Sequence, residues 1–489
     1  MNILIYKSIL IFNFIILGIL FLFCPEEVNK FYIFSCLITV LFSLIVFYRV
    51  KIRQTNQFIL FSITTFFLLS YIIVHFQIPI IELFGISIKS NIFHFIWTDE
   101  SIINKSIITS SLGILAFMIG SFILDVNIKE QKNIIVKYRT NKSILFLIVP
   151  TYIFYILFFI TSGSYSLGAY YAGDQLGMSN YFFSAFNVFL SSILITRLYY
   201  ISLINNQKIN FIAYLKLFGM PVLIIVLWHI AFSFYVGDRG PVLIYSTLLM
   251  SLYFTRFHRF KFIYLIIFFL LVGPIMSLMS QARSRYIGQS YLDRMKNAQM
   301  VYSEKTKILS KFESDNIIMP QTVELAYSIR CLNHAIYSIS DINDYFFGYF
   351  QIRQIVSCIP GAGGIFLKIF GDNNKKYNGS SGYITYLIQG DYPKYGDGTS
   401  VTADLYLDFG ILGVIVGCML FGAFLSRYEQ YLYKNSINSM LIWIILLLYL
   451  SSALSLGRST FLHIFQNVFI IYVVISINDL IIKKISSNE

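Results

Sequence analysis

The stretch Thr402–Leu425, TADLYLDFGILGVIVGCMLFGAFL, decides the fold of this chain. Apart from two aspartates near its start it is almost wholly apolar, and it is long enough to cross the hydrocarbon of a bilayer as a helix, which takes about 20 residues. Stretches of the same kind recur from one end of the chain to the other. The expected spans lie at residues 3–23, 31–48, 58–76, 106–124, 143–161, 181–203, 217–236, 241–255, 262–279, 402–425, 439–456 and 461–481.

The composition agrees with a membrane protein. Of the 489 residues, 57% are hydrophobic and only 12% are charged, and the mean hydropathy is +0.70. A soluble globular domain carries about 25% charged residues, so this composition excludes a soluble enzyme, a disordered chain and a fibrous repeat. We therefore expect an all-α polytopic membrane protein with about 12 transmembrane helices.

The expected spans divide the chain into three parts. Residues 1–279 hold the first nine spans, residues 280–401 form one large external loop, and residues 402–489 hold the last three spans. A loop of this length is usually functional or a small domain in its own right. Residues 290–312 mix charged with apolar side chains, Pro320 is expected to open a helix that ends near Ser340, and residues 344–370 are aromatic and apolar. These stretches predict short helices, so we expect the loop to be mainly helical.

The net charge of +13 orients the chain. The short loops on one side hold 18 Lys and Arg, against 5 on the other side. Because basic residues stay in the cytoplasm, this contrast predicts cytoplasmic N- and C-termini and places the large loop outside. The basic excess is thereby explained, and we expect no nucleic-acid partner.

Several arginines lie on the outer side, against this bias, and so require another explanation. They are Arg239, in a short turn between the seventh and eighth spans, Arg283 and Arg285 after the ninth span, Arg330 and Arg353 in the large loop, and Arg458 between the last two spans. Guanidinium groups bind phosphate through two parallel hydrogen bonds and keep their charge at any working pH. We expect them to bind the pyrophosphate of a lipid carrier. The alternatives are interaction with lipid headgroups and, for Arg239, pairing with Asp238.

Two carboxylates stand at the outer end of the tenth span. Asp404 and Asp408 are four residues apart, so in a helix they share one face. A carboxylate at a membrane boundary is costly and is therefore a functional candidate, here as general base on a sugar hydroxyl. The alternative is a structural ion pair with an external arginine. Thr399, Ser400 or Thr402 is expected to cap the helix.

His334 is a third candidate for acid–base chemistry, four residues after Arg330 on an expected loop helix. Cys331 and Cys358 lie in the same loop, and the sequence leaves open whether they form a disulfide or are free thiols. The chain has no phosphate-binding loop, no H-E-x-x-H and no Cys/His cluster, so we expect no metal and no cofactor.

At two places the chain resembles the Wzy-type O-antigen polymerases, which polymerise oligosaccharide repeat units. Gly237–Leu243 is similar to the G-x-R-G turn that precedes an apolar span in that family. Gly396–Ser400 followed by Tyr406–Gly413 is similar to the family's G-x-G-T-S and Y-x-D-F-G-x-x-G sequences at the start of a late span. Arg353 and Gly364 also fit an R-x10-G spacing of the family. The number of spans and the late external loop match the family's layout.

The resemblance implies a membrane-embedded glycosyltransferase of the bacterial plasma membrane. Its substrates would be undecaprenyl-pyrophosphate-linked oligosaccharides at the outer face, its surroundings membrane lipids, and its partners a flippase and a chain-length regulator. In that reading the external arginines bind the substrate pyrophosphate, and Asp404, Asp408 or His334 removes a proton from the acceptor sugar.

Two other functions share this layout. An O-antigen ligase would transfer the glycan to a different acceptor, and a lipid-linked oligosaccharide flippase or transporter would move its substrate without chemistry. Transporters tend to contain internal repeats, and this sequence shows no obvious repeat.

Overall fold

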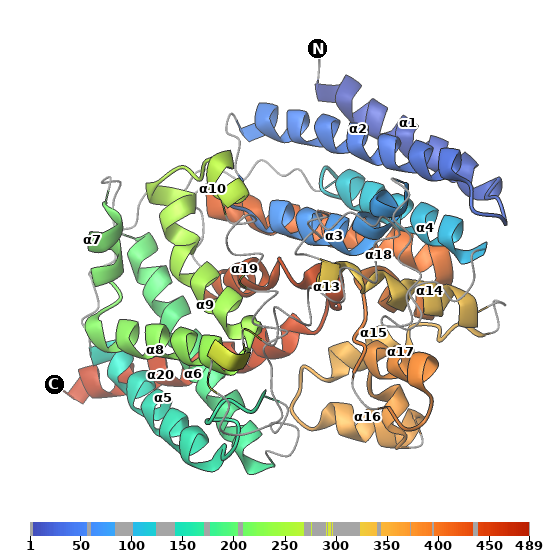
Figure 1. Ribbon diagram of the computed structural model, residues 1–489. Helices are drawn as coiled ribbons and strands as arrows, with labels where there is room; N and C mark the ends of the chain where they lie inside the picture. The colour runs from blue at the N-terminus through green and yellow to red at the C-terminus, as the bar shows by residue number, and fades with distance from the viewer. Residues whose placement is uncertain are drawn as a thin grey trace. The chain divides into compact units, whose positions relative to one another are not determined.

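A computed structural model describes residues 3–55, 60–83, 101–123, 142–170, 177–203, 209–267, 323–339, 344–371, 373–393, 396–433 and 439–488, together with residues 275, 290, 292–294 and 296. Every regular element within these residues is helical (Figure 1). Arg283, Arg285 and most of the helix expected at 290–312 lie outside the described residues.

The described helices support a multi-pass membrane protein. Six are long and apolar enough to cross a membrane. These are α1 (Ile3–Leu22), α2 (Lys30–Thr55), α3 (Ile63–Leu83), α4 (Ser101–Gly120), α6 (Met178–Ser202) and α18 (Val401–Tyr433). Three shorter apolar helices accompany them: α5 (Lys142–Thr161), α8 (Met220–Val236) and α19 (Met440–Ser452). The all-helical class is confirmed, and the number of about 12 spans stays a prediction.

The chain forms two compact units. Unit 1 comprises residues 1–128, 305–430 and 453–463, and unit 2 comprises residues 129–304, 431–452 and 464–489. Besides five of the long helices, unit 1 contains the helices of the large loop and a short turn. These are α13 (Val323–Ala326), α14 (Ile329–Ser338), α15 (Tyr349–Val356), α16 (Ala362–Phe370), η5 (Lys375–Asn378), α17 (Ser380–Gln389) and η6 (Leu456–Arg458).

Unit 2 is a second group of packed helices. Besides α5, α6, α8 and α19 it contains α7 (Phe211–Lys216), α9 (Arg239–Leu252), η2 (Tyr253–Phe257), α10 (Phe262–Ile267) and α20 (Ile464–Asn488). Within it, α5 packs along α6, α8 along α9, and α19 against both α9 and α20. Aromatic rings fill much of the interior; His229 of α8, for example, lies edge-on to Phe186 at 4.8 Å between ring centroids.

Helix α18 is broken near its start. Phe409 (φ −144°) and Gly410 (φ 61°, ψ −148°) leave the helical conformation, so that Val401–Asp408 forms a separate first segment. The segment turns back along the remainder of α18. A Cβ added to Gly413 would lie only 2.5 Å from the Leu405 carbonyl oxygen, although the two residues are eight positions apart. The sequence predicts a single span over residues 402–425, and the structure divides it after Asp408.

Gly410 is required at the break, which yields a stability prediction. Its φ and ψ lie in a region that only glycine adopts readily, and a Cβ there would meet the Tyr345 hydroxyl at 2.5 Å. We expect Gly410→Ala to cost about 1–3 kcal/mol in backbone strain alone, measured as a lower thermal unfolding temperature in detergent. Gly18→Ala in α1 is the control, because the added methyl meets nothing within 4 Å. Equal unfolding temperatures for the two variants would contradict the proposed strain.

Helices α4 and α18 touch along their backbones. A Cβ on Gly120 would lie 2.0 Å from the Met419 carbonyl oxygen, and one on Gly422 would lie 2.1 Å from that of Phe117. Small residues that allow such close approach are typical of helix pairs in membranes, where van der Waals packing drives association. This contact fixes the long part of α18 within unit 1.

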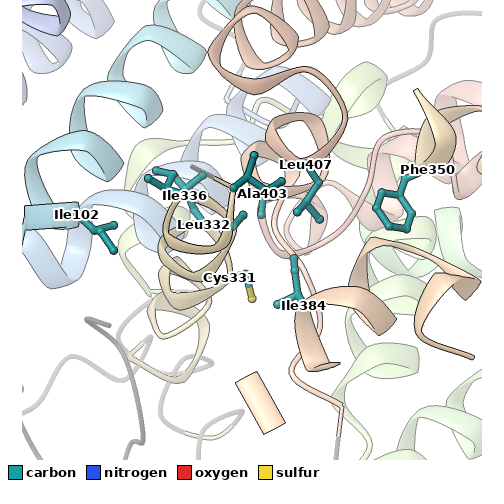
Figure 2. Close-up of a cluster of buried hydrophobic side chains, with 10 residues drawn as sticks. Ile102, Cys331, Leu332, Ile336, Phe350, Ile384, Ala403 and Leu407 are labelled. Carbon is teal, nitrogen blue, oxygen red and sulfur yellow. The ribbon is translucent and has the colours of Figure 1, made fainter. Parts of the chain in front are cut away.

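A cluster of buried apolar side chains joins the loop helices to the start of α18 (Figure 2). It includes Ile102 of α4, Cys331 and Leu332 of α14, Phe350 of α15, Ile384 of α17, and Ala403 and Leu407 of α18. Their chain neighbours are polar: Arg330 precedes Cys331, Gln351 follows Phe350, and Asp404 and Asp408 follow Ala403 and Leu407. The apolar cluster therefore anchors the elements that carry the candidate site.

Candidate active site

A buried ion pair lies just before α18. Arg330 of α14 pairs with the carboxylate of Asp397, whose side chain is fully buried. The Gln389 amide donates a hydrogen bond to the other carboxylate oxygen at 2.5 Å, and the Asp397 backbone N–H donates to the Thr385 hydroxyl at 3.0 Å. A buried carboxylate is stable only when it is paired and hydrogen-bonded, and Asp397 has both kinds of contact.

Arg458 adds a second cation beside this pair. The turn that carries it rests on α3, where the Gly457 N–H donates to the Ser70 hydroxyl at 3.1 Å. A Cβ on Gly398 would lie 3.9 Å from Nε of Arg458, so the guanidinium reaches the residue next to Asp397. Arg330, Asp397 and Arg458 are called the charged cluster below. Two arginines and one carboxylate give the charged cluster a net positive charge.

Cys331 lies under the charged cluster as a buried free thiol. Its sulfur is 3.8 Å from the Asp397 carbonyl oxygen, and burial raises the pKa of the thiol to about 11 although both arginines of the cluster favour the thiolate. Cys358 is also free. The sequence leaves open a disulfide or two free thiols, and the structure contains the free thiols.

Asp404 stands on the first segment of α18, and its side chain is 1% exposed. The Gln351 amide donates to its carboxylate at 2.8 Å and the Gln354 amide at 3.2 Å, both from α15. The Ser400 hydroxyl accepts the Ala403 N–H at 3.2 Å, so the expected cap of this helix is confirmed at Ser400.

Asp408, one turn later, faces the same helix. Its two carboxylate oxygens accept the backbone N–H groups of Phe350 at 3.2 Å and Gln351 at 3.0 Å, in the first turn of α15. The first N–H groups of a helix have no partner within it and carry partial positive charge, so a carboxylate there stabilises the helix. The expectation that Asp404 and Asp408 share one face is confirmed, since both contact Gln351.

The capping at this point is reciprocal. The break in α18 leaves the last carbonyl groups of its first segment without helical partners. The Phe346 N–H donates to the Leu407 carbonyl at 3.0 Å, and the Phe347 N–H donates to the Asp408 carbonyl at 2.9 Å. Each of the two helix ends thus satisfies the backbone groups of the other.

The remaining candidates of unit 1 lie on the same loop helices. Arg353 of α15 contacts the Ser357 hydroxyl at 3.0 Å and the Asn378 side-chain oxygen of η5. Gly364, in α16, has open space where a Cβ would be. His334 follows Arg330 by one turn of α14 and is 7% exposed.

Arg239 belongs to unit 2 and is the first residue of α9. Gly237 ends α8 in the left-handed conformation (φ 92°), and the Asp238 carboxylate caps α9 by accepting the Gly240 N–H at 3.3 Å. A two-residue turn therefore places the arginine at a helix N-terminus.

Sequence reasoning overlooked four polar residues of this site. Asp397 lies within the glycine-flanked Gly396–Ser400, and an aspartate so close to a span is the signal that points to it. Gln351, Gln354 and Gln389 carry no such signal, since neutral amides on loop helices are common. Among the residues that the structure describes, no group of three His, Cys, Asp or Glu side chains is arranged to hold a metal ion.

Comparisons with known proteins identify the family. The searches found no matching curated protein and no matching solved structure. The family model for the O-antigen polysaccharide polymerase Wzy matches residues 3–487, nearly the whole chain. The chain therefore belongs to the O-antigen polysaccharide polymerase Wzy family, and it is a glycosyltransferase that polymerises lipid-linked repeat units.

Proposed function

We propose that this polymerase joins undecaprenyl-pyrophosphate-linked repeat units into O-antigen or capsular polysaccharide at the outer face of the bacterial plasma membrane, with both chain termini in the cytoplasm. The reaction centre lies in unit 1, between the charged cluster and α15. The observation that carries this proposal is the charged cluster itself, because it stands within and beside Gly396–Ser400, the stretch that resembles the family sequence.

In the proposed reaction, the terminal sugar hydroxyl of one lipid-linked unit attacks the anomeric carbon that joins the growing chain to its own carrier. A new glycosidic C–O bond forms, the C–O bond to the pyrophosphate breaks, and the pyrophosphate leaves with the electron pair. The hydroxyl proton passes to a base of the protein. The products are a chain extended by one unit on the second carrier and undecaprenyl pyrophosphate on the first.

The arginines stabilise the charge that develops on the leaving pyrophosphate. Nε of Arg330 and Nε of Arg353 are buried and have no hydrogen-bond acceptor among the described residues, so each retains a donor for a phosphate oxygen. Arg458 supplies a further cation beside Arg330. Arg239, a residue of unit 2, is a further proposed ligand of a carrier pyrophosphate. Arg283 and Arg285, which lie outside the described residues, are proposed for the same role.

Asp404 is the proposed base. Its hydrogen-bond donors are side chains, namely the amides of Gln351 and Gln354 and the hydroxyl of Ser380, and these can rotate away when a sugar hydroxyl arrives. The donors to Asp408 are backbone N–H groups of α15, which cannot leave without unwinding the helix. Asp408 therefore positions α15 and its two glutamines. His334 is the other base candidate, and a His334→Gln variant that retains full polymerisation would remove it.

Reconstitution tests the proposed function. Protein in liposomes with purified lipid-linked repeat units is expected to produce a ladder of oligomers on gels. Arg239→Ala is expected to abolish the ladder and leave single units on the carrier, because one phosphate-binding cation is lost. Arg427→Ala is the control, since this arginine is exposed near the opposite end of α18 and is expected to leave the ladder unchanged. A normal ladder from well-folded Arg239→Ala protein would exclude the proposed role of Arg239.

A further inference from the structure

A cleft lined by several polar side chains and by glycines opens in the large loop of unit 1. Its volume is about 650 Å³, within the range of about 300–1,000 Å³ that is usual for small-molecule sites. Its walls come from η5, from the first turns of α17 and from the segment between α17 and α18. No described step of the proposed reaction uses it.

The cleft presents groups that suit a sugar. Lys375, Ser381 and Asp391 provide an ammonium, a hydroxyl and a carboxylate, which donate to or accept from hydroxyl groups. Tyr386 adds an aromatic ring with a polar tip, and Nζ of Lys376 lies 4.2 Å from the centre of that ring. Sugar rings combine apolar C–H faces with a rim of hydroxyl groups, so one aromatic ring among donors and acceptors matches them.

Part of the cleft wall is exposed backbone, because glycines form it. Gly390, Gly396 and Gly398 line the cleft, and none of the three carries a side chain that would cover its peptide groups. Gly390 and Gly398 have positive φ values of 77° and 79°. A ligand can therefore approach the peptide groups of this wall closely.

The cleft adjoins the charged cluster through shared residues. Thr385 lines the cleft, and its hydroxyl accepts the Asp397 N–H at 3.0 Å. Gly398 lines the cleft and lies beside Arg458. A molecule that occupies the cleft therefore lies against Thr385 and Gly398, and these two residues adjoin Asp397 and Arg458 of the charged cluster.

We propose that this cleft binds the oligosaccharide portion of a lipid-linked substrate and so holds the glycan while its carrier end is at the charged cluster. This inference rests on the proposed function and names the substrate part that the loop recognises. A phosphate ligand fits less well, because Asp391 stands in the same cleft as the two lysines and would repel it.

Binding of free oligosaccharide tests the inference independently of catalysis. The probe is the repeat-unit oligosaccharide released from its carrier by mild acid, titrated by calorimetry into full-length protein in nanodiscs. We expect Tyr386→Ala to weaken binding about tenfold through loss of the aromatic contact, and Tyr386→Phe to bind nearly as the unaltered protein. Tyr392→Ala is the matched control, because Tyr392 is 94% exposed and outside the cleft wall.

Polymerisation kinetics provide the second measurement. Tyr386→Ala is expected to raise KM for the lipid-linked donor about tenfold with kcat unchanged, as for loss of a contact made equally in substrate and transition state. Unchanged binding and KM in folded Tyr386→Ala would overturn the inference, as would displacement of the oligosaccharide by inorganic pyrophosphate. Failure of the proposed function looks different: the unaltered protein would bind the oligosaccharide but form no ladder.

Discussion

Replacing Asp404 by asparagine is expected to abolish polymer while single repeat units remain on the carrier. A general base contributes about 10²–10⁴-fold to a rate, and the neutral amide cannot accept the proton of the sugar hydroxyl. The fold should survive, because asparagine has nearly the same shape and its carbonyl oxygen still accepts from Gln351 or Gln354, whose amides can turn to pair with it. The measurement is the oligomer ladder from reconstituted protein, together with the thermal unfolding temperature.

Asp408→Asn is the matched control, four residues further along the same helix. An amide there accepts only one of the two N–H groups that start α15, so we expect a lower unfolding temperature but a residual ladder. The two variants thus separate chemistry from positioning. The opposite pattern, with an inactive but stable Asp408→Asn and an active Asp404→Asn, would move the base to Asp408.

Replacing Asp397 by alanine is expected to destabilise the protein by about 3–5 kcal/mol, as when one partner of a buried ion pair is removed. Arg330 would keep a largely buried charge without its carboxylate, since its side chain is only 17% exposed. The measurement is the thermal unfolding temperature in detergent. The double variant Arg330→Met, Asp397→Leu is expected to restore stability, because apolar residues of similar size often replace such a pair without loss.

The double variant also tests the role of Arg330 in the reaction. It restores the packing but not the guanidinium, so we expect a stable protein without a polymer ladder. A stable double variant that polymerises normally would limit Arg330 and Asp397 to a structural role. Instability of the double variant equal to that of Asp397→Ala would show that the pair itself is needed for folding.

Much of the fold could be predicted from hydropathy, because the bilayer imposes its length on every span. The expected span at 3–23 corresponds closely to α1, and the span expected at 31–48 lies within α2, which continues to Thr55. Local chemistry was also predictable: Ser400 caps α18, and Gly237 with Asp238 forms the turn between α8 and α9. Both signals depend on a few neighbouring residues, and single-sequence reasoning can evaluate them.

The break in α18 could not be predicted, because it depends on a residue distant in the chain. Gly410 within an apolar run also suits an uninterrupted helix, and the groups that bond to Leu407 and Asp408 at the break come from residues 346–351, far away in the sequence. The partners of the carboxylates were missed for the same reason. The alternative to catalysis was an ion pair of Asp404 or Asp408 with an arginine, whereas Arg330 pairs with Asp397 and the two aspartates contact amides of α15.

The reciprocal capping between α15 and the first segment of α18 makes these two helix ends a single unit of local unfolding. They are joined across 58 positions of sequence. Opening either end would leave unpaired donors on one and unpaired acceptors on the other, so the two open and close together. A substrate that fixes α15 through its glutamines therefore also fixes the first segment of α18. Part of the binding energy of the substrate then holds Asp404 in position.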